Sequence, residues 1–242
     1  MHIIAGMHRS GTSMVAGMIY KLGGDFGNKD DLIAADKWNP KGYFENKDVV
    51  KINNELIFGK IGKFSYLYPP QIKSITRRVK QINKRVETIE SKFNDKFVKD
   101  NRFCLTLPCW PNNATSLIIV LRNPISIALS LKKRNKIPFI LALKIWRYHI
   151  LRLLYFGRIN KKHYVFFENL IDTNKRVYEL EKLIKFINKN SNYDLNINLG
   201  KDLLKSDFIL KKESVFMNEN YYNKNKFKKY TTLWNLIKNK YG

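Results

Sequence analysis

One stretch decides the fold of this chain: Ile3-Ile4-Ala5-Gly6-Met7-His8-Arg9-Ser10-Gly11-Thr12-Ser13. Its first three residues form a short apolar run that is typical of a buried strand. A helical pattern follows the loop, from about Thr12 to Leu22, and Gly23 and Gly24 end it. A buried strand that turns tightly into a helix is half of a parallel strand-helix-strand unit. The chain therefore begins as an α/β domain.

Strands and helices continue to alternate downstream. Leu117 to Leu121 is apolar at every position, which is typical of a central parallel strand covered on both faces. The pattern predicts further strands at residues 97–99 and 164–167, and helices at about 45–57, 72–93, 124–135, 139–156 and 176–187. We expect an α/β fold, a P-loop-like three-layer domain whose mostly parallel central sheet is flanked by helices. We expect one domain over residues 1–242, with a core over about 1–190 and a helical, Lys/Asn-rich extension over about 191–242.

The helix predicted at residues 72–93 carries a regular apolar stripe. Its members recur with alternating spacings of three and four: Ile72, Ile75, Val79, Ile82, Val86, Ile89 and Phe93. Such a stripe has two interpretations. It could be the seam of a dimer, or it could pack one long helix across its own domain, which is the commoner outcome and the one we favour.

The high net charge says less about the binding partners of this protein than its size suggests. The formal charge is +25 and the isoelectric point is near 9.9, which favours polyanionic partners. However, lysine far outnumbers arginine and asparagine is abundant, as an AT-rich genome would produce. Nucleic-acid readers favour arginine, so no nucleic-acid partner is expected.

Cysteines and apolar runs indicate the compartment. Cys104 and Cys109 are too few for a disulfide framework and are predicted to be core thiols. The run from Ile137 to Trp146 is short and interrupted by Lys144, so no transmembrane segment is expected. Without a secretion signal, the predicted localisation is cytoplasmic. Peripheral contact with a membrane surface stays open.

The opening loop nearly matches the phosphate-binding pattern G-x-x-x-x-G-K-[ST]. Gly6 and Gly11 occupy the glycine positions, but Thr12 replaces the lysine and the loop's permanent cation is Arg9. Backbone N–H groups around Ser10 to Ser13 would face an anion at the positive end of the helix dipole. The loop therefore predicts a phosphate or sulfate site without the group that P-loop enzymes direct at the β- and γ-phosphates.

A second anion site is predicted where the central strand ends. Arg122 follows the strand, Asn123 is a good helix cap, and Pro124 suits the first helical position. Ser130 lies eight residues beyond Arg122 in the same helix. Two such sites at the carboxyl edge of one sheet predict a ligand with two separated anionic groups.

Together, GMHRSGTS (Gly6 to Ser13) and LRNPISIALSLKKR (Leu121 to Arg134) resemble the two signatures of sulfotransferases that use 3'-phosphoadenosine-5'-phosphosulfate (PAPS). Three further segments resemble the bacterial carbohydrate-sulfotransferase-like branch of that family: NPKGYFE (Asn39 to Glu45), VKDNRFCLTLPCW (Val98 to Trp110) and YVFFENLIDTNKRVYELEKLIKFI (Tyr164 to Ile187). The similarity runs in order from residue 1 to about residue 190.

The resemblance implies a function and a set of site residues. PAPS would be the donor and adenosine 3',5'-bisphosphate the product, with no metal ion. Arg9 and the backbone of Ser10, Gly11, Thr12 and Ser13 would hold and activate the phosphosulfate, whereas Arg122 and Ser130 would hold the 3'-phosphate. Glu45 would be the general base that deprotonates a hydroxyl or amine of the acceptor, a carbohydrate or glycolipid. Lys99 would assist the leaving group.

The sequence also departs from the family pattern. Met14 replaces an adenine-stacking aromatic residue, and Lys99-Asp100-Asn101-Arg102 replaces the usual Lys-Asp-Pro-Arg. A glycine-rich lid over the 3'-phosphate is missing, and the basic segment Lys224 to Lys229 is its candidate replacement. We expect Asn28 to Lys41, Gly59 to Gln71 and the C-terminal tail to form the acceptor pocket.

Two other functions stay open. A P-loop kinase of a small metabolite would bind ATP with Mg²⁺, and a non-catalytic polyanion-binding protein would bind any polyanion with a steep salt dependence.

Overall fold

The computed structural model describes residues 1–59, 71–110, 114–157, 161–205 and 225–242. Its centre is a parallel sheet of four strands: β1 (His2–Ala5), β2 (Phe97–Lys99), β3 (Ser116–Leu121) and β4 (Lys162–Phe166). The strand order is β2-β1-β3-β4, and Ile4 of β1 pairs with Ile118 of β3. The predicted α/β fold with a parallel central sheet is confirmed.

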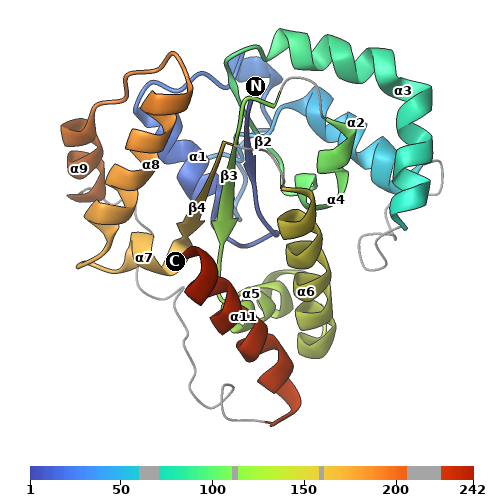
Figure 1. Ribbon diagram of the computed structural model, residues 1–242, viewed down its shortest axis with the longest axis vertical. Coiled ribbons are helices and arrows are strands. Elements are labelled where there is room, and N and C mark those ends of the chain that lie inside the picture. Colours follow the sequence, from blue (N-terminus) through green and yellow to red (C-terminus); the bar gives the residue numbers. More distant parts are fainter. Residues whose placement is uncertain (60–70, 111–113, 158–160, 206–224) are drawn as a thin grey trace.

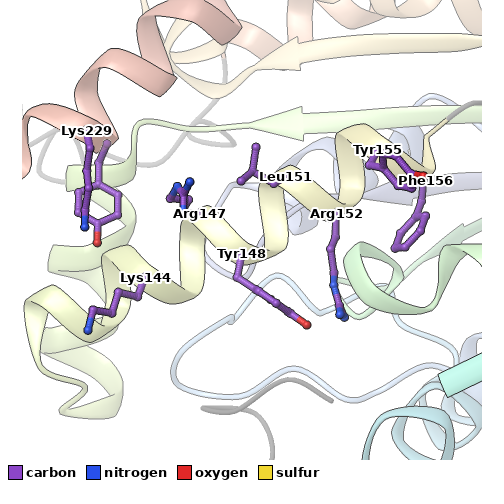
Figure 2. Close-up of a pocket in the computed structure, with 9 residues that line it drawn as sticks. Lys144, Arg147, Tyr148, Leu151, Arg152, Tyr155, Phe156 and Lys229 are labelled. Carbon is purple, nitrogen blue, oxygen red and sulfur yellow. The ribbon is translucent and has the colours of Figure 1, made fainter. Parts of the chain in front are cut away.

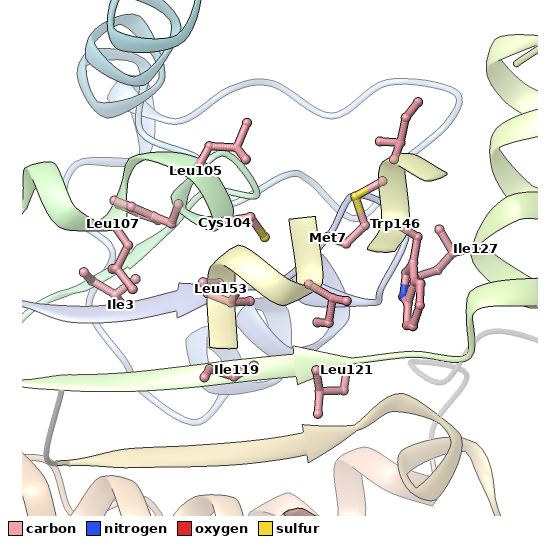
Figure 3. Close-up of a cluster of buried hydrophobic side chains, with 14 of the residues drawn as sticks. Ile3, Met7, Cys104, Leu105, Leu107, Ile119, Leu121, Ile127, Trp146 and Leu153 are labelled. Atoms are coloured by element: carbon pink, nitrogen blue, oxygen red, sulfur yellow. The ribbon is translucent and has the colours of Figure 1, made fainter. Parts of the chain in front are cut away.

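Helices cover both faces of the sheet (Figure 1). Alternate residues of β3 face opposite layers, as the two-residue period of a strand requires. Ile118 and Val120 join the apolar cluster under α1 (Thr12–Lys21), α8 (Arg176–Asn190) and α9 (Ile197–Lys205). Leu117, Ile119 and Leu121 join the larger cluster, which Figure 3 shows in part. The result is the predicted arrangement of three layers.

The larger cluster is covered by six helices. These are α2 (Lys47–Phe58), α3 (Ile72–Lys92), α4 (Phe103–Thr106), α5 (Pro124–Asn135), α6 (Phe139–Phe156) and α11 (Lys228–Tyr241). The long helices begin and end close to their predicted bounds. The sequence patterns missed α4 and α7 (Phe167–Ile171), which are too short to establish a period.

The apolar stripe of α3 lies inside the protein. Ile75, Ile82, Val86 and Phe93 are buried in the larger cluster, and Val79 and Ile89 pack against it. The helix lies mainly over α2 and over the 3₁₀ turn Leu107–Cys109. The interpretation as a packing helix is therefore confirmed, and the described part of this stripe offers no seam for a dimer.

The two cysteines are buried and not joined to each other. Burial raises the pKa of the Cys109 thiol to about 12 and that of Cys104 further still, so both are core thiols, as predicted. Among the helices that the structure describes, none combines the length and the apolar character that crossing a membrane requires.

Candidate functional site

The loop after β1 makes a tight turn, which is possible because glycines stand at the two positions where a side chain would clash with neighbouring atoms. A Cβ on Gly6 would lie 2.6 Å from both Ser10 Oγ and the Val120 carbonyl oxygen. Gly11 has a φ of +95°, and a Cβ there would overlap the ring of Phe167. Only glycine meets both requirements at Gly11. The loop is thereby pressed between β3 and the end of β4.

The amino end of α1 has the features of an anion site. Gly11 is its cap, and no side chain within the described ranges caps it. Thr12 Oγ1 donates to Asn101 Oδ1 over 2.8 Å. Ser10 is 1% exposed, and its Oγ has no hydrogen-bond partner in the described part of the chain. Uncapped N–H groups beside a buried, unsatisfied hydroxyl suit a bound oxyanion.

Arg9, Ser130 and Arg122 meet beside this loop. Arg9 Nε donates to Ser130 Oγ over 2.8 Å, and Arg122 Nη1 donates to the Arg9 carbonyl oxygen over 2.9 Å. The Arg122 guanidinium lies 4.2 Å from the centroid of the Phe167 ring. Burial lowers the pKa of Arg122 to about 10, with Glu168 opposing the shift and Arg9 adding to it. Two desolvated cations side by side are stabilised by an anion.

Glu168 is a site residue that the sequence reasoning missed. Its Oε1 accepts from the backbone N–H of Asn123 over 2.8 Å, which ties the start of α7 to the start of α5. Its Oε2 is buried without a hydrogen-bond partner among the described residues, and burial raises its pKa. A signal was present in the sequence, since Glu168 directly follows a predicted strand and so had to lie at the carboxyl edge of the sheet.

Glu45 lies in a second cluster, with a buried cation from β2. Lys99 Nζ is 2.5 Å from Glu45 Oε1 and 3.2 Å from Ser13 Oγ. Arg102 Nη1 lies 3.5 Å from Glu45 Oε2. The Lys99 and Glu45 side chains are 1% and 8% exposed. The cation beside Ser13 therefore comes from a different strand, whereas Arg9 contacts Ser130.

The Lys99-Asp100-Asn101-Arg102 turn is fixed by side chains instead of a proline. Asp100 Oδ1 accepts from the N–H and Nη1 of Arg102, both over 2.9 Å, and Asp100 Oδ2 accepts from Asn53 Nδ2 over 2.8 Å. The side-chain oxygen of Asn101 accepts a hydrogen bond from the Thr12 hydroxyl. Asn101 thus supplies a hydrogen-bond acceptor for Thr12 of the opening loop.

The segment from Asp36 to Tyr43, before Glu45, contacts the last turn of α5. Tyr43 OH donates to Asp36 Oδ2 over 2.8 Å and accepts from Arg134 Nη2 over 2.9 Å. Arg134 also lies over the exposed Trp38 ring, 5.4 Å from its centroid. Burial, and next the charge of Arg134, lower the pKa of Arg9. Part of the predicted acceptor region is therefore near Arg9.

The predicted site residues thus gather at one edge of the sheet. Arg9, Arg122 and Ser130 form one group, and Glu45, Lys99 and Ser13 form the other. Met14 is buried in the core under α1. Residues 60–70 of the predicted acceptor region and residues 206–224 of the C-terminal tail, including Lys224 of the proposed lid, lie outside the described residues. Within the described ranges, no three His, Cys, Asp or Glu side chains gather as a metal site.

Comparison with known proteins gave no relative: no family model matches this chain, and no curated protein does.

Proposed function

We propose that this protein is a sulfotransferase that moves a sulfuryl group from PAPS to a hydroxyl or amine of a carbohydrate or glycolipid. The observation that carries the proposal is the contact of Arg9 with both Ser130 and Arg122 beside the uncapped end of α1. A donor with a 5'-phosphosulfate and a 3'-phosphate needs two neighbouring anion subsites of this kind.

The residues fit the donor at both ends. The N–H groups at the start of α1 and the unsatisfied Ser10 hydroxyl suit the phosphosulfate. Arg122 supplies a charge-assisted donor for the 3'-phosphate, and the Ser130 hydroxyl supplies a second hydrogen bond. Arg9 touches Ser130, so its guanidinium can serve both subsites.

The second cluster supplies the chemistry. Glu45 accepts the proton of the acceptor hydroxyl or amine as the new bond to sulfur forms. The bond between sulfur and the bridging oxygen breaks, and its electron pair stays on the 5'-phosphate of the product. Lys99, which lies within 3.2 Å of Ser13 Oγ, stabilises this developing charge together with the helix end. One bond to sulfur forms as another breaks and no oxidation state changes, so the transfer needs no oxidant or reductant.

Calorimetry tests the proposal. Adenosine 3',5'-bisphosphate should bind at a single site with the same affinity with and without Mg²⁺, and labelled sulfate should then pass from PAPS to a panel of carbohydrates. A chain that binds no bisphosphate would overturn the proposal, and binding without transfer to any acceptor would overturn the catalytic part.

One observation favours a kinase as the second candidate. Lys99 brings a cation to Ser13 from a neighbouring strand, which partly replaces the lysine missing from the loop. The same titration separates the two functions, because a kinase would bind ATP more tightly with Mg²⁺ and would bind the bisphosphate weakly.

A further inference from the structure

A groove runs along the outer face of α6, away from the residues discussed so far. It has a volume of about 680 Å³, within the range of ligand sites in proteins. Figure 2 shows Lys229 near the amino-terminal half of α6 and Tyr155 and Phe156 at its other end. Its lining is Lys144, Arg147, Tyr148, Leu151, Arg152, Tyr155, Phe156, Lys229 and Tyr230.

The lining is basic and aromatic because of the helical period. A spacing of four residues places Lys144, Tyr148, Arg152 and Phe156 in one row along α6. Arg147, Leu151 and Tyr155 form the neighbouring row, and α6 contains no acidic residue. Four cations, three phenols and two apolar side chains therefore share one hollow, whose charge is complementary to an anion.

Two of the rings are already covered by cations. The Arg152 guanidinium lies 4.1 Å from the centroid of the Tyr148 ring, and Lys229 Nζ lies 5.1 Å from that of Tyr230. These contacts occupy one face of each ring and hold the charges in place. Tyr155 is 60% exposed and lies at the mouth of the groove.

We propose that this groove binds an acidic carbohydrate chain. The cations match carboxylate or sulfate groups, and the phenols of Tyr148 and Tyr155 can exchange hydrogen bonds with hydroxyls. Leu151 and Phe156 can pack against the apolar faces of sugar rings. A single-stranded nucleic acid would stack successive bases on open ring faces. Of the three tyrosines that line the groove, Tyr230 is 2% exposed and Tyr148 has one face covered by Arg152, which leaves Tyr155 as the largely exposed ring. A bilayer surface would suit a flat or protruding face better than a hollow.

The inner side of α6 belongs to the same apolar cluster as Met7 of the opening loop. His149, the neighbour of Tyr148, is buried on the inner side of α6, and its charge is one of those that lower the pKa of His8 in the opening loop. That the bound chain is the acceptor rests on the proposed function, whereas binding in the groove does not.

Fluorescence anisotropy on the whole protein tests the proposal. The probes are a labelled polyuronate, a neutral dextran, a single-stranded DNA oligonucleotide and vesicles containing an anionic lipid, all at physiological salt. The groove variant is K144E/R147E, and the matched control is K80E/K84E on the exposed face of α3, which changes the net charge equally. A second pair, Tyr155→Ala and Tyr178→Ala, changes no charge and removes rings that are 60% and 65% exposed.

We expect the polyuronate to bind and the dextran not to bind. K144E/R147E should weaken polyuronate binding at least tenfold and Tyr155→Ala several-fold, whereas both control variants should bind like the wild type. Equal losses in the groove and control variants would overturn the proposal, because the binding would then follow net charge alone. Groove-dependent binding of DNA or vesicles without polyuronate binding would overturn it too.

The same variants separate this inference from the proposed function. Binding of adenosine 3',5'-bisphosphate should be unchanged in K144E/R147E. If the bisphosphate fails to bind while the polyuronate binds through the groove, the transferase proposal fails and the groove stands. The reverse result rejects the groove alone.

Discussion

Arg9 Nε donates a hydrogen bond to Ser130 Oγ over 2.8 Å, across 121 residues of sequence. The family resemblance implies that these residues hold opposite ends of the donor, whereas in the structure they are in contact. Arg122 completes the group through the Arg9 carbonyl oxygen. The two proposed anion subsites are therefore adjacent, and a change at Arg122 should affect the opening loop as well as the subsite proposed around Arg122.

Arg122→Ala should weaken binding of adenosine 3',5'-bisphosphate by roughly 10- to 100-fold, because it removes a desolvated, charge-assisted donor worth about 1.5–3 kcal/mol. Calorimetry measures the loss. Arg85→Ala is the matched control, since Arg85 lies on the exposed face of α3, and it should bind normally. Unchanged affinity in Arg122→Ala would contradict the assignment of this subsite.

Glu45→Gln should lower turnover severely and leave bisphosphate affinity within about threefold, because the amide no longer accepts a proton. The measurement is kcat beside calorimetric affinity. Lys99→Met should lower turnover too, by withdrawing the cation near Ser13. Wild-type turnover in Glu45→Gln would reject Glu45 as the base.

The same two residues should be coupled in stability. Removing either Glu45 or Lys99 leaves the charge of the other buried, which should lower the free energy of unfolding by about 3–5 kcal/mol. Removing both avoids this penalty. A double-mutant cycle of Glu45→Gln and Lys99→Met by urea unfolding should therefore give a strongly non-additive result. Additive losses would mean that the pair is solvated in the folded protein.

Gly11→Ala should destabilise the protein more than Gly23→Ala. Both glycines have a positive φ, of 95° and 103°, so both substitutions carry a backbone cost of about 1–2 kcal/mol. A Cβ on Gly11 also overlaps Phe167, whereas one on Gly23 meets nothing within 4 Å. Overpacking should add about 1–3 kcal/mol at Gly11 alone, measured by urea unfolding. Equal losses would show that the Phe167 ring moves aside.

Stability should fall in mild acid. Burial lowers the pKa of His149 and of His163 to about 4, from an ordinary value of 6.5. The unfolded chain therefore binds protons first as the pH drops, so the stabilisation present above pH 6.5 is lost progressively between pH 6.5 and 4. The melting temperature of the wild type should fall across this range, and His149→Gln should flatten the fall. A profile that His149→Gln leaves unchanged would contradict this origin.

The fold could be predicted from the sequence because its signals are local. The apolar strands, the glycines after α1 and the Asn123-Pro124 start of α5 each act within a few residues. The apolar stripe of α3 predicts the helix itself. It does not predict what the helix packs against, because the same spacing suits a dimer seam and a domain core. Its burial depends on α2 and the turn after α4, which lie outside the helix, so the spacing within α3 does not reveal them.

The site was predictable only in part, for the same reason. Arg9, Arg122 and Ser130 were found through spacing, but their mutual contact arises from the sheet. Lys99 beside Ser13 and Glu168 beside Asn123 are pairings between different strands and loops. No spacing rule within one segment predicts such pairs.

The strand order also has a consequence for how the chain folds. β1 precedes the other three described strands in the chain, yet it lies in the interior of the sheet between β2 and β3. Its partners start at Phe97 and Ser116, so a nascent chain that has not yet passed Leu121 cannot pair both edges of β1. Non-local pairings of this kind slow folding and leave strand edges open to aggregation. Gly6 lies against the Val120 carbonyl oxygen of β3, so the opening loop cannot reach its final packing before β3 has been synthesised and paired.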